Sequence, residues 1–193
     1  MTLPPLPDLQ AASGIDAQLR QVVTDRSLLD RARGVAESHI ANVQRRGDEP
    51  ALVRALGYLG EVDRISGWFV ESAMVLERAL DIATRRGERR MRVATLIRLG
   101  ELNRCRDRFD AAEALLNQAL GASADPDCAD YLHFALQHLG KTLLDAGRLQ
   151  DAVETLETAL AVRRELGEPS LIASAEQALV VARAASCKRT ETG

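Results

Sequence analysis

An internal repeat of forty residues is the feature that most constrains how this chain can fold. The dipeptide Leu-Gly recurs at residues 59–60, 99–100 and 139–140, and the same step aligns many further apolar positions. These include the leucines before each pair and the Ala-Leu pairs after it: Leu56, Leu96, Leu136, Ala79-Leu80, Ala119-Leu120 and Ala159-Leu160. Self-similarity at a fixed period of this length is typical of stacked supersecondary units, so the sequence predicts a repeat architecture.

Each unit is predicted to form two helices joined by a tight turn. The first carries L-x-x-L-G, and the second carries a [FL]-x-x-[AS]-x-x-x-L-x-x-A-L stripe with the 3.6-residue period of an amphipathic helix. The turns are expected at Ser66-Gly67, Arg106-Asp107 and Ala146-Gly147. Aromatic residues make up only 3% of the chain, which fits helices better than strands. The predicted fold class is therefore all-α, an α-solenoid of antiparallel helix pairs.

Three glycines share one register position in the middle of the first helices: Gly60, Gly100 and Gly140. Glycine costs about 1 kcal/mol relative to alanine in a helix interior. Its recurrence predicts a close backbone approach that no side chain would permit. The residues expected to face this notch are Ser72, Ala112 and Ala152.

The two ends of the chain depart from the three full units, which span residues 48–87, 88–127 and 128–167. Residues 1–13 are expected to be a flexible arm, and residues 14–47 a degenerate first repeat. In that repeat Ile15, Leu19 and Val23 would form one apolar line along a helix, and Arg20 replaces the glycine. Residues 168–186 are predicted to be a capping helix, followed by a tail at 187–193.

The capping helix has apolar residues on more than one face, because Val180 and Val181 lie beside Leu179. Either one valine is exposed, which is common, or the cap contacts another subunit. A homodimer through this end is therefore a hypothesis.

Composition and charge exclude several classes of function. The formal net charge of −3 disfavours a nucleic-acid binder, which needs a basic face. No window has the apolar length of a membrane span, and the N-terminus lacks the pattern of a secretory signal. Three cysteines without paired spacing do not suggest a disulfide framework. The expected location is cytoplasmic.

No catalytic motif is visible. The sequence lacks a glycine-rich phosphate loop, H-E-x-x-H, G-x-S-x-G and paired C-x-x-C, so we expect neither an enzyme nor a cofactor. His133 and His138 are five residues apart, which places them on different helix faces. A metal held by Cys105 and His138 is not expected, because no further ligand is evident.

The pattern L-x-x-L-G followed by A-x-x-x-L-x-x-A resembles that of tetratricopeptide repeats, over most of residues 48–167. Leucine replaces the family's aromatic residue, and Asp63, Asn103 and Leu143 occupy its tyrosine position. The forty-residue unit is similar to the repeats of kinesin light chains and of bacterial peptide-sensing regulators. The resemblance implies a right-handed superhelix; HEAT-type repeats are the structural alternative.

The resemblance also implies that the first helices line a concave groove that binds extended peptides or helices. The candidate binding residues lie on the face opposite the L-x-x-L-G positions. They are Arg54, Tyr58, Glu61, Arg64, Arg98, Glu101, Arg104, Phe134, Gln137, His138 and Lys141. The alternative is a solvated helix face with i, i+3 salt bridges, such as Glu61 with Arg64. The Lys-Asn clamp with which some family members hold a C-terminal carboxylate is not reproduced.

The leading functional hypothesis is a non-catalytic scaffold that binds a protein or peptide partner in the groove, with no nucleic acid and no membrane as partner. One alternative is a sensor of a peptide or small molecule in a bacterial regulatory system. Another is a self-assembling structural protein, suggested only by the apolar cap.

Overall fold

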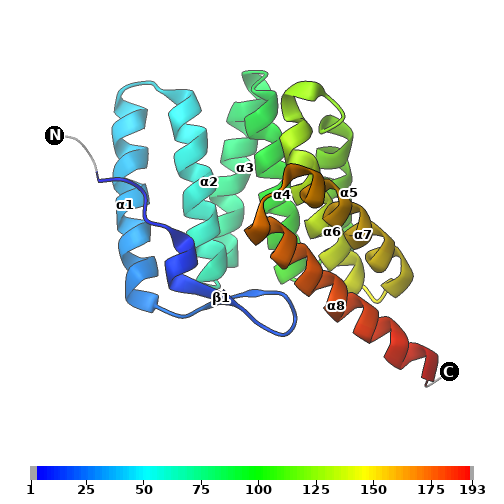
Figure 1. Cartoon of the computed structure of the whole chain (residues 1–193). Helices are drawn as coiled ribbons and strands as arrows, with labels where there is room; N and C mark the ends of the chain where they lie inside the picture. Colours follow the sequence, from blue (N-terminus) through cyan, green and yellow to red (C-terminus); the bar gives the residue numbers. More distant parts are fainter. Residues whose placement is uncertain (1–3, 192–193) are drawn as a thin grey trace.

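The forty-residue units fold as antiparallel helix pairs, as Figure 1 shows for residues 4–191, the part of the chain that the computed structural model describes. The helices are α1 (Arg26–Arg45), α2 (Glu49–Ile65), α3 (Phe69–Arg85), α4 (Arg89–Cys105), α5 (Phe109–Ala122), α6 (Leu132–Asp145), α7 (Leu149–Leu166) and α8 (Pro169–Glu191). Each helix packs against the next one along the chain, so the described helices form a single solenoid. The predicted all-α solenoid is confirmed.

The tight turns within the repeats depend on a residue in the left-handed conformation. Gly67 and Gly147 take this conformation in the first and third full units, with φ of 82° and 77°. Asp107 occupies the equivalent place in the second unit with φ of 56°. An aspartate is strained there relative to glycine, although it tolerates this region better than most residues.

The third unit begins later than its register predicts. A short 3₁₀ helix, η2 (Pro126–Tyr131), lies between α5 and α6, so that α6 starts only at Leu132. Asp125 caps η2, because its side chain accepts a hydrogen bond from the Asp127 N–H at 3.0 Å. The Asp-Pro pair at residues 125–126 therefore begins an extra turn between α5 and α6, whereas short connections through Gly47 and Gly87 lead into α2 and α4.

The close approach predicted at the helix glycines is confirmed. A Cβ atom on Gly60, Gly100 or Gly140 would lie 2.5–2.6 Å from the Cγ atom of a leucine on the following helix. These leucines are Leu76, Leu116 and Leu156. Two of the expected facing residues also lie at this contact: Ser72 Oγ donates to the Gly60 carbonyl at 2.8 Å, and the Ala152 carbonyl would lie 3.5 Å from a Cβ atom on Gly140.

The predicted helix through Ile15, Leu19 and Val23 is wrong. Strand β1 (Ser13–Ile15) pairs with β2 (Gln21–Val23) in an antiparallel hairpin. Asp16 forms the turn, since its side chain accepts hydrogen bonds from the backbone N–H groups of Gln18 and Arg20. The degenerate first repeat of residues 14–47 thus contributes only one helix, α1.

The expected flexible arm is also corrected over residues 4–13. The 3₁₀ helix η1 (Leu9–Ala12) buries Ala12 against Leu29 of α1 and Ile65 of α2. The chain before it follows α1 and α2, where the carbonyl of Pro4 is 2.6 Å from His39 Nε2. Residues 1–3 lie outside the described residues.

Helix α8 covers the end of the solenoid by packing Ala178 and Leu179 against Leu156 and Leu160 of α7. It extends to Glu191, beyond the predicted end at residue 186 and through most of the predicted tail; residues 192–193 lie outside the described part. Of the two adjacent valines, Val181 is half-buried, whereas Val180 is 67% exposed.

Candidate functional site

The candidate site is built from the first helices of the three full units, α2, α4 and α6, which pack side by side in the solenoid. The leucines and glycine of each L-x-x-L-G segment are buried, except for Leu136, which is half-buried. The opposite stripe of each helix therefore faces the groove, and positions forty residues apart form rows across it. The repeat period alone places the candidate residues in these rows.

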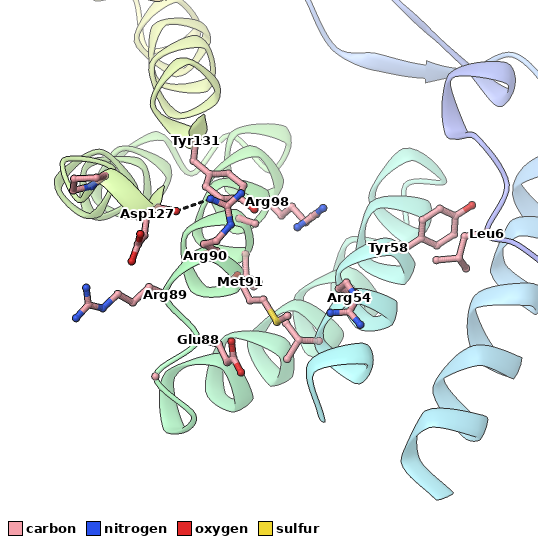
Figure 2. A pocket seen from close by; sticks show the side chains of 15 residues that line it. Leu6, Arg54, Tyr58, Glu88, Arg89, Arg90, Met91, Arg98, Asp127 and Tyr131 are labelled. Carbon is pink, nitrogen blue, oxygen red and sulfur yellow. Dashed lines mark hydrogen bonds between the residues drawn. The ribbon is translucent and has the colours of Figure 1, made fainter. Parts of the chain in front are cut away.

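A cavity of about 1040 Å³ lies at the N-terminal ends of α2 and α4, beside η2. Figure 2 shows Tyr58 and Leu6 on one side of it, and Arg90 and Tyr131 on the other. A smaller cavity of about 270 Å³ continues from it toward α6. Its walls combine an apolar part with charged groups: Ala94, Ile97, Tyr131 and Phe134 with Glu61, Arg98, Glu101 and His138.

Seven of the eleven predicted binding residues line these two cavities: Arg54, Tyr58, Glu61, Arg98, Glu101, Phe134 and His138. The other four lie outside both: Arg64, Arg104, Gln137 and Lys141. The eleven residues therefore do not form one site. Some face open space, and others hold the solenoid together.

Glu101 is the centre of a buried charged cluster. Its carboxylate lies 2.7 Å from Arg104 Nη2, 2.7 Å from His138 Nδ1 and 3.4 Å from Lys141 Nζ. Burial would raise the pKa of Glu101, but Lys141, His138 and Arg104 outweigh it and hold that pKa well below its usual range. Glu101 is therefore ionised and already fully paired.

Burial together with the adjacent Lys141 lowers the pKa of His138. The ring is consequently neutral at pH 7, and its Nδ1–H donates to Glu101. Burial also lowers the pKa of Lys141. These two side chains contribute hydrogen bonds and charge to the cluster and are poor candidates for direct ligand contacts.

The N-terminal hairpin covers the C-terminal ends of α2 and α4. The fully buried Arg104 donates to the carbonyl of Leu19 at 3.1 Å and to Asp145 at 2.7 Å. Arg64 donates to Gln21 Oε1 at 2.5 Å and to Glu61 at 2.8 Å. The two arginines predicted to bind a partner instead bind this chain's own N-terminal segment.

Two more predicted residues make contacts within the chain. Gln137 Nε2 donates to the carbonyl of Ser174, 3.2 Å away on α8, and so ties the cap to α6. The Tyr58 hydroxyl donates to the carbonyl of Pro7 at 2.7 Å. Burial and the nearby charge of Asp8 raise the pKa of Tyr58 to about 12, so the hydroxyl keeps its proton.

Arg54 and Arg98 are the cations that remain available to a ligand. Arg54 has no hydrogen-bond or ion-pair partner among residues 4–191. Within the described part of the chain, Arg98 forms an ion pair only with Glu61, with Nε 4.0 Å from Oε1. Both guanidinium groups border the larger cavity, so this part of the groove is suited to carboxylates.

Arg90 and Tyr131 are groove residues that the sequence did not single out as binding residues. Arg90 forms a double hydrogen bond with Asp130, donates to the carbonyl of Asp127 at 2.5 Å and lies 5.2 Å from the centre of the Tyr131 ring (Figure 2). The insertion of η2 hides these residues from the repeat register. The sequence features that could have indicated Arg90 and Tyr131 are the Asp-Pro pair at residues 125–126 and the arginine pair at the start of α4.

Within residues 4–191, no group of three or more His, Cys, Asp or Glu side chains is arranged to hold a metal ion. Cys105 Sγ is instead 3.9 Å from Arg64 Nη1, and burial raises the pKa of its thiol. None of the helices in the described range has the length and hydropathy needed to cross a membrane. The arrangement offers shape, charge and apolar surface for recognition.

Comparison with known proteins gives consistent matches. Two family models described as tetratricopeptide repeat match residues 29–124 and 135–170. The repeat protein of Podosopora anserina described as a kinesin light chain has a TM-score of 0.63 at 22% identity, covering 86% of this chain and 82% of that one. BtubC (BKLC) from P. vanneervenii has a TM-score of 0.66 at 19% identity, covering 84% and 74%. At these identities the structural matches show the fold. No curated protein matches the sequence.

Proposed function

The chain belongs to the tetratricopeptide repeat family, whose repeats generally mediate protein–protein interactions, and on that premise we propose that it is a non-catalytic scaffold that binds a peptide segment of a partner protein. The binding region is the open part of the groove, formed by the two connected cavities along α2, α4 and η2. The observation that carries the proposal is the pair Arg54 and Arg98, which border a large cavity without strong partners in the described residues.

The lining suggests the chemistry of the peptide. Arg54 and Arg98 favour an acidic residue, because guanidinium groups bind carboxylates with two parallel hydrogen bonds. The smaller cavity has an apolar wall of Ile97, Tyr131 and Phe134, which suits one apolar or aromatic side chain. An extended peptide with an acidic residue near an apolar anchor fits both features.

The rigidity of the groove favours such binding. The helices are held by buried leucines beneath the groove and by the Glu101 cluster at its floor. A preorganised surface loses little conformational entropy when it binds, so less of the interaction energy is offset by ordering of the groove.

The test is to select peptides from a random linear library on the wild-type protein and measure their affinity by fluorescence polarisation. We expect Arg54→Glu/Arg98→Glu to weaken binding roughly tenfold or more, because like charges then face the acidic residue. The matched control is Arg31→Glu/Arg78→Glu, two exposed arginines on α1 and α3 whose replacement changes the net charge equally. Arg104 is unsuitable for this test, since it is fully buried.

Affinity that survives Arg54→Glu/Arg98→Glu in a folded protein would contradict the proposal. An equal loss in the control variant would also contradict it, because the effect would then be one of overall charge. Far-UV circular dichroism and thermal unfolding establish that each variant is folded.

A further inference from the structure

The tip of the N-terminal hairpin lies on the groove at the end away from the open cavities. The contact joins residues far apart in sequence: Arg20 Nη2 is 2.8 Å from Asp107 and 3.6 Å from Asp145, and the Leu19 carbonyl accepts from Arg104. The Leu19 side chain is 4% exposed in a cluster with residues of α7 and α8. In Figure 1 the loop of the hairpin accordingly reaches from the α1–α2 end of the solenoid toward α8.

The base of the hairpin is held differently from its tip. At the base, Ala12 is buried with Leu29 and Ile65, and Val23 packs against them. At the tip, the ion pair of Arg20 with Asp107 is exposed, and exposed pairs contribute about 0–1 kcal/mol. The tip therefore depends on the Leu19 side chain, on the buried hydrogen bond from Arg104 to the Leu19 carbonyl and on the exposed pair of Arg20 with Asp107, whereas the base is packed in a separate apolar cluster.

Both sides of this contact have a costly backbone conformation. Leu19 has φ of 59°, which costs a residue with a Cβ atom about 1–2 kcal/mol. Asp107 has φ of 56° at the turn position where the neighbouring units have Gly67 and Gly147. Strained residues of this kind persist where the surrounding contacts compensate for them, and they are concentrated at ligand clamps and switches.

The ion pair of Asp107 with Arg20 accounts for the presence of aspartate rather than glycine at this turn. A glycine would relieve the strain but would remove the carboxylate that binds Arg20. Together with Asp145, which also pairs with Arg104, Asp107 places two carboxylates beside the Arg20 guanidinium, whereas the open cavity at the other end has Arg54 and Arg98. The two ends therefore favour ligands of opposite charge.

We propose that Arg104, Asp107, Asp145 and the apolar cluster around Leu179, together called the tip socket, form a second peptide-binding site. Its ligand is a peptide turn that presents a leucine followed by an arginine, and Leu19-Arg20 is the occupant built into this chain. A partner segment with the same pair binds by displacing the tip. This site does not depend on the proposed function, which concerns the cavities at the other end of the groove.

The built-in occupant lowers the apparent affinity of any competitor. The apparent dissociation constant equals the intrinsic one divided by the fraction of molecules with an empty socket. If the tip is docked for about nine-tenths of the time, a variant whose tip stays undocked binds a competitor about tenfold more tightly.

The probe for the test is a cyclic peptide of residues 13–23, titrated by calorimetry into the full-length chain. We expect Leu19→Asn/Arg20→Ser to bind it roughly tenfold more tightly than the wild type does. Asparagine tolerates positive φ, so this variant keeps the hairpin turn and the carbonyl of residue 19, and it loses the two docking side chains. Adding Asp107→Gly should abolish the gain, because it removes a carboxylate of the socket and leaves a turn residue suited to that conformation.

A second measurement uses the wild-type protein alone. With saturating probe, the amide NMR signals of residues 16–20 should move, and those of Ala12 and Val23 should not. Equal affinity of the wild type and Leu19→Asn/Arg20→Ser, or unmoved signals at saturation, would overturn the proposal. Arg54→Glu/Arg98→Glu should leave probe binding unchanged, which separates this test from that of the open cavities.

Discussion

Replacing Gly100 by alanine tests the packing on which the whole solenoid depends. The added Cβ atom would lie 2.6 Å from Cγ and 2.8 Å from Cδ2 of Leu116, whereas carbon atoms in contact are normally about 3.5–4.0 Å apart. Leu116 is fully buried on α5, and its Cγ atom is the branch point of the side chain. A change of rotamer alone does not resolve the clash, so α4 and α5 must separate by about 1 Å.

Two opposing effects determine the magnitude. Alanine is favoured over glycine in a helix interior by about 1 kcal/mol. Overpacking a well-packed core costs about 1–3 kcal/mol, and a contact that requires backbone movement lies at the upper end of that range. We therefore expect a net destabilisation of about 1–2 kcal/mol, which corresponds to roughly 2–8 °C in Tm for a chain of this size.

Gly34 provides the matched control, because it also lies within a helix but a Cβ atom there would meet nothing within 4 Å. Gly34→Ala should therefore stabilise the protein by about 0.5–1 kcal/mol. Urea unfolding followed by circular dichroism measures both variants under the same conditions. A neutral or stabilising effect of Gly100→Ala would refute the close approach, since the two substitutions are predicted to have opposite signs.

Three further predictions address burial, charge and the cap. Burial and the nearby Arg163 lower the pKa of His133 from 6.5 to about 4. Between these two pH values His133 is protonated in the unfolded chain and neutral in the folded chain. Stability should fall as the pH drops through this window, and urea midpoints of His133→Gln should depend less on pH. Arg104→Met should lower the free energy of unfolding by about 3 kcal/mol in urea unfolding, because it deprives the buried Glu101 of a partner. Val180→Glu should leave both Tm and sedimentation unchanged, whereas Val181→Glu, in the half-buried position, should lower Tm; a shift to smaller species with Val180→Glu would instead reveal self-association through α8.

The repeated part of the fold was predictable because one physical requirement recurs three times. Gly60, Gly100 and Gly140 share a register position since each lies beneath a leucine of the next helix, and such agreement within one sequence serves as an internal control. The leucines were the part of the contact that was not predicted. The small residue Ser72 does contact Gly60, and the leucine four positions later packs against the same glycine.

The N-terminal hairpin was not predictable from apolar spacing. Ile15, Leu19 and Val23 are four residues apart, as a helix requires, but the hairpin places them at β1, at the turn and in β2. The turn made by Asp16 and the capping of α1 by Asp25 were local signals against a helix. What holds the hairpin in place is tertiary contact with α1 and α2 at its base and with α4, α7 and α8 at its tip, which no local pattern encodes.

The burial of several candidate site residues could not be predicted from the sequence either. The i, i+3 spacing, given as the alternative interpretation, predicted the pair of Glu61 with Arg64, which forms at 2.8 Å; Glu101 and Arg104 form the equivalent pair at 2.7 Å. Such pairs were expected on a solvated helix face, but Arg64, Glu101 and Arg104 are buried. A charged residue at a groove position appears the same in sequence whether the groove is open or covered.

The residues that distinguish this chain from a uniform solenoid are those that break its register. Arg20 stands where the later units have a helix glycine, and Asp107 stands where they have a turn glycine. The structure brings these two substitutions into one ion pair. The Asp-Pro pair at residues 125–126 likewise inserts η2, which supplies Tyr131 to both cavities. In a repeat protein the regular positions maintain the fold. A residue that breaks the repeat and has a strained backbone conformation is therefore a candidate for a role in binding. By this reasoning Asp107→Gly, which restores the repeat, should relieve strain in the turn and at the same time loosen the hairpin tip.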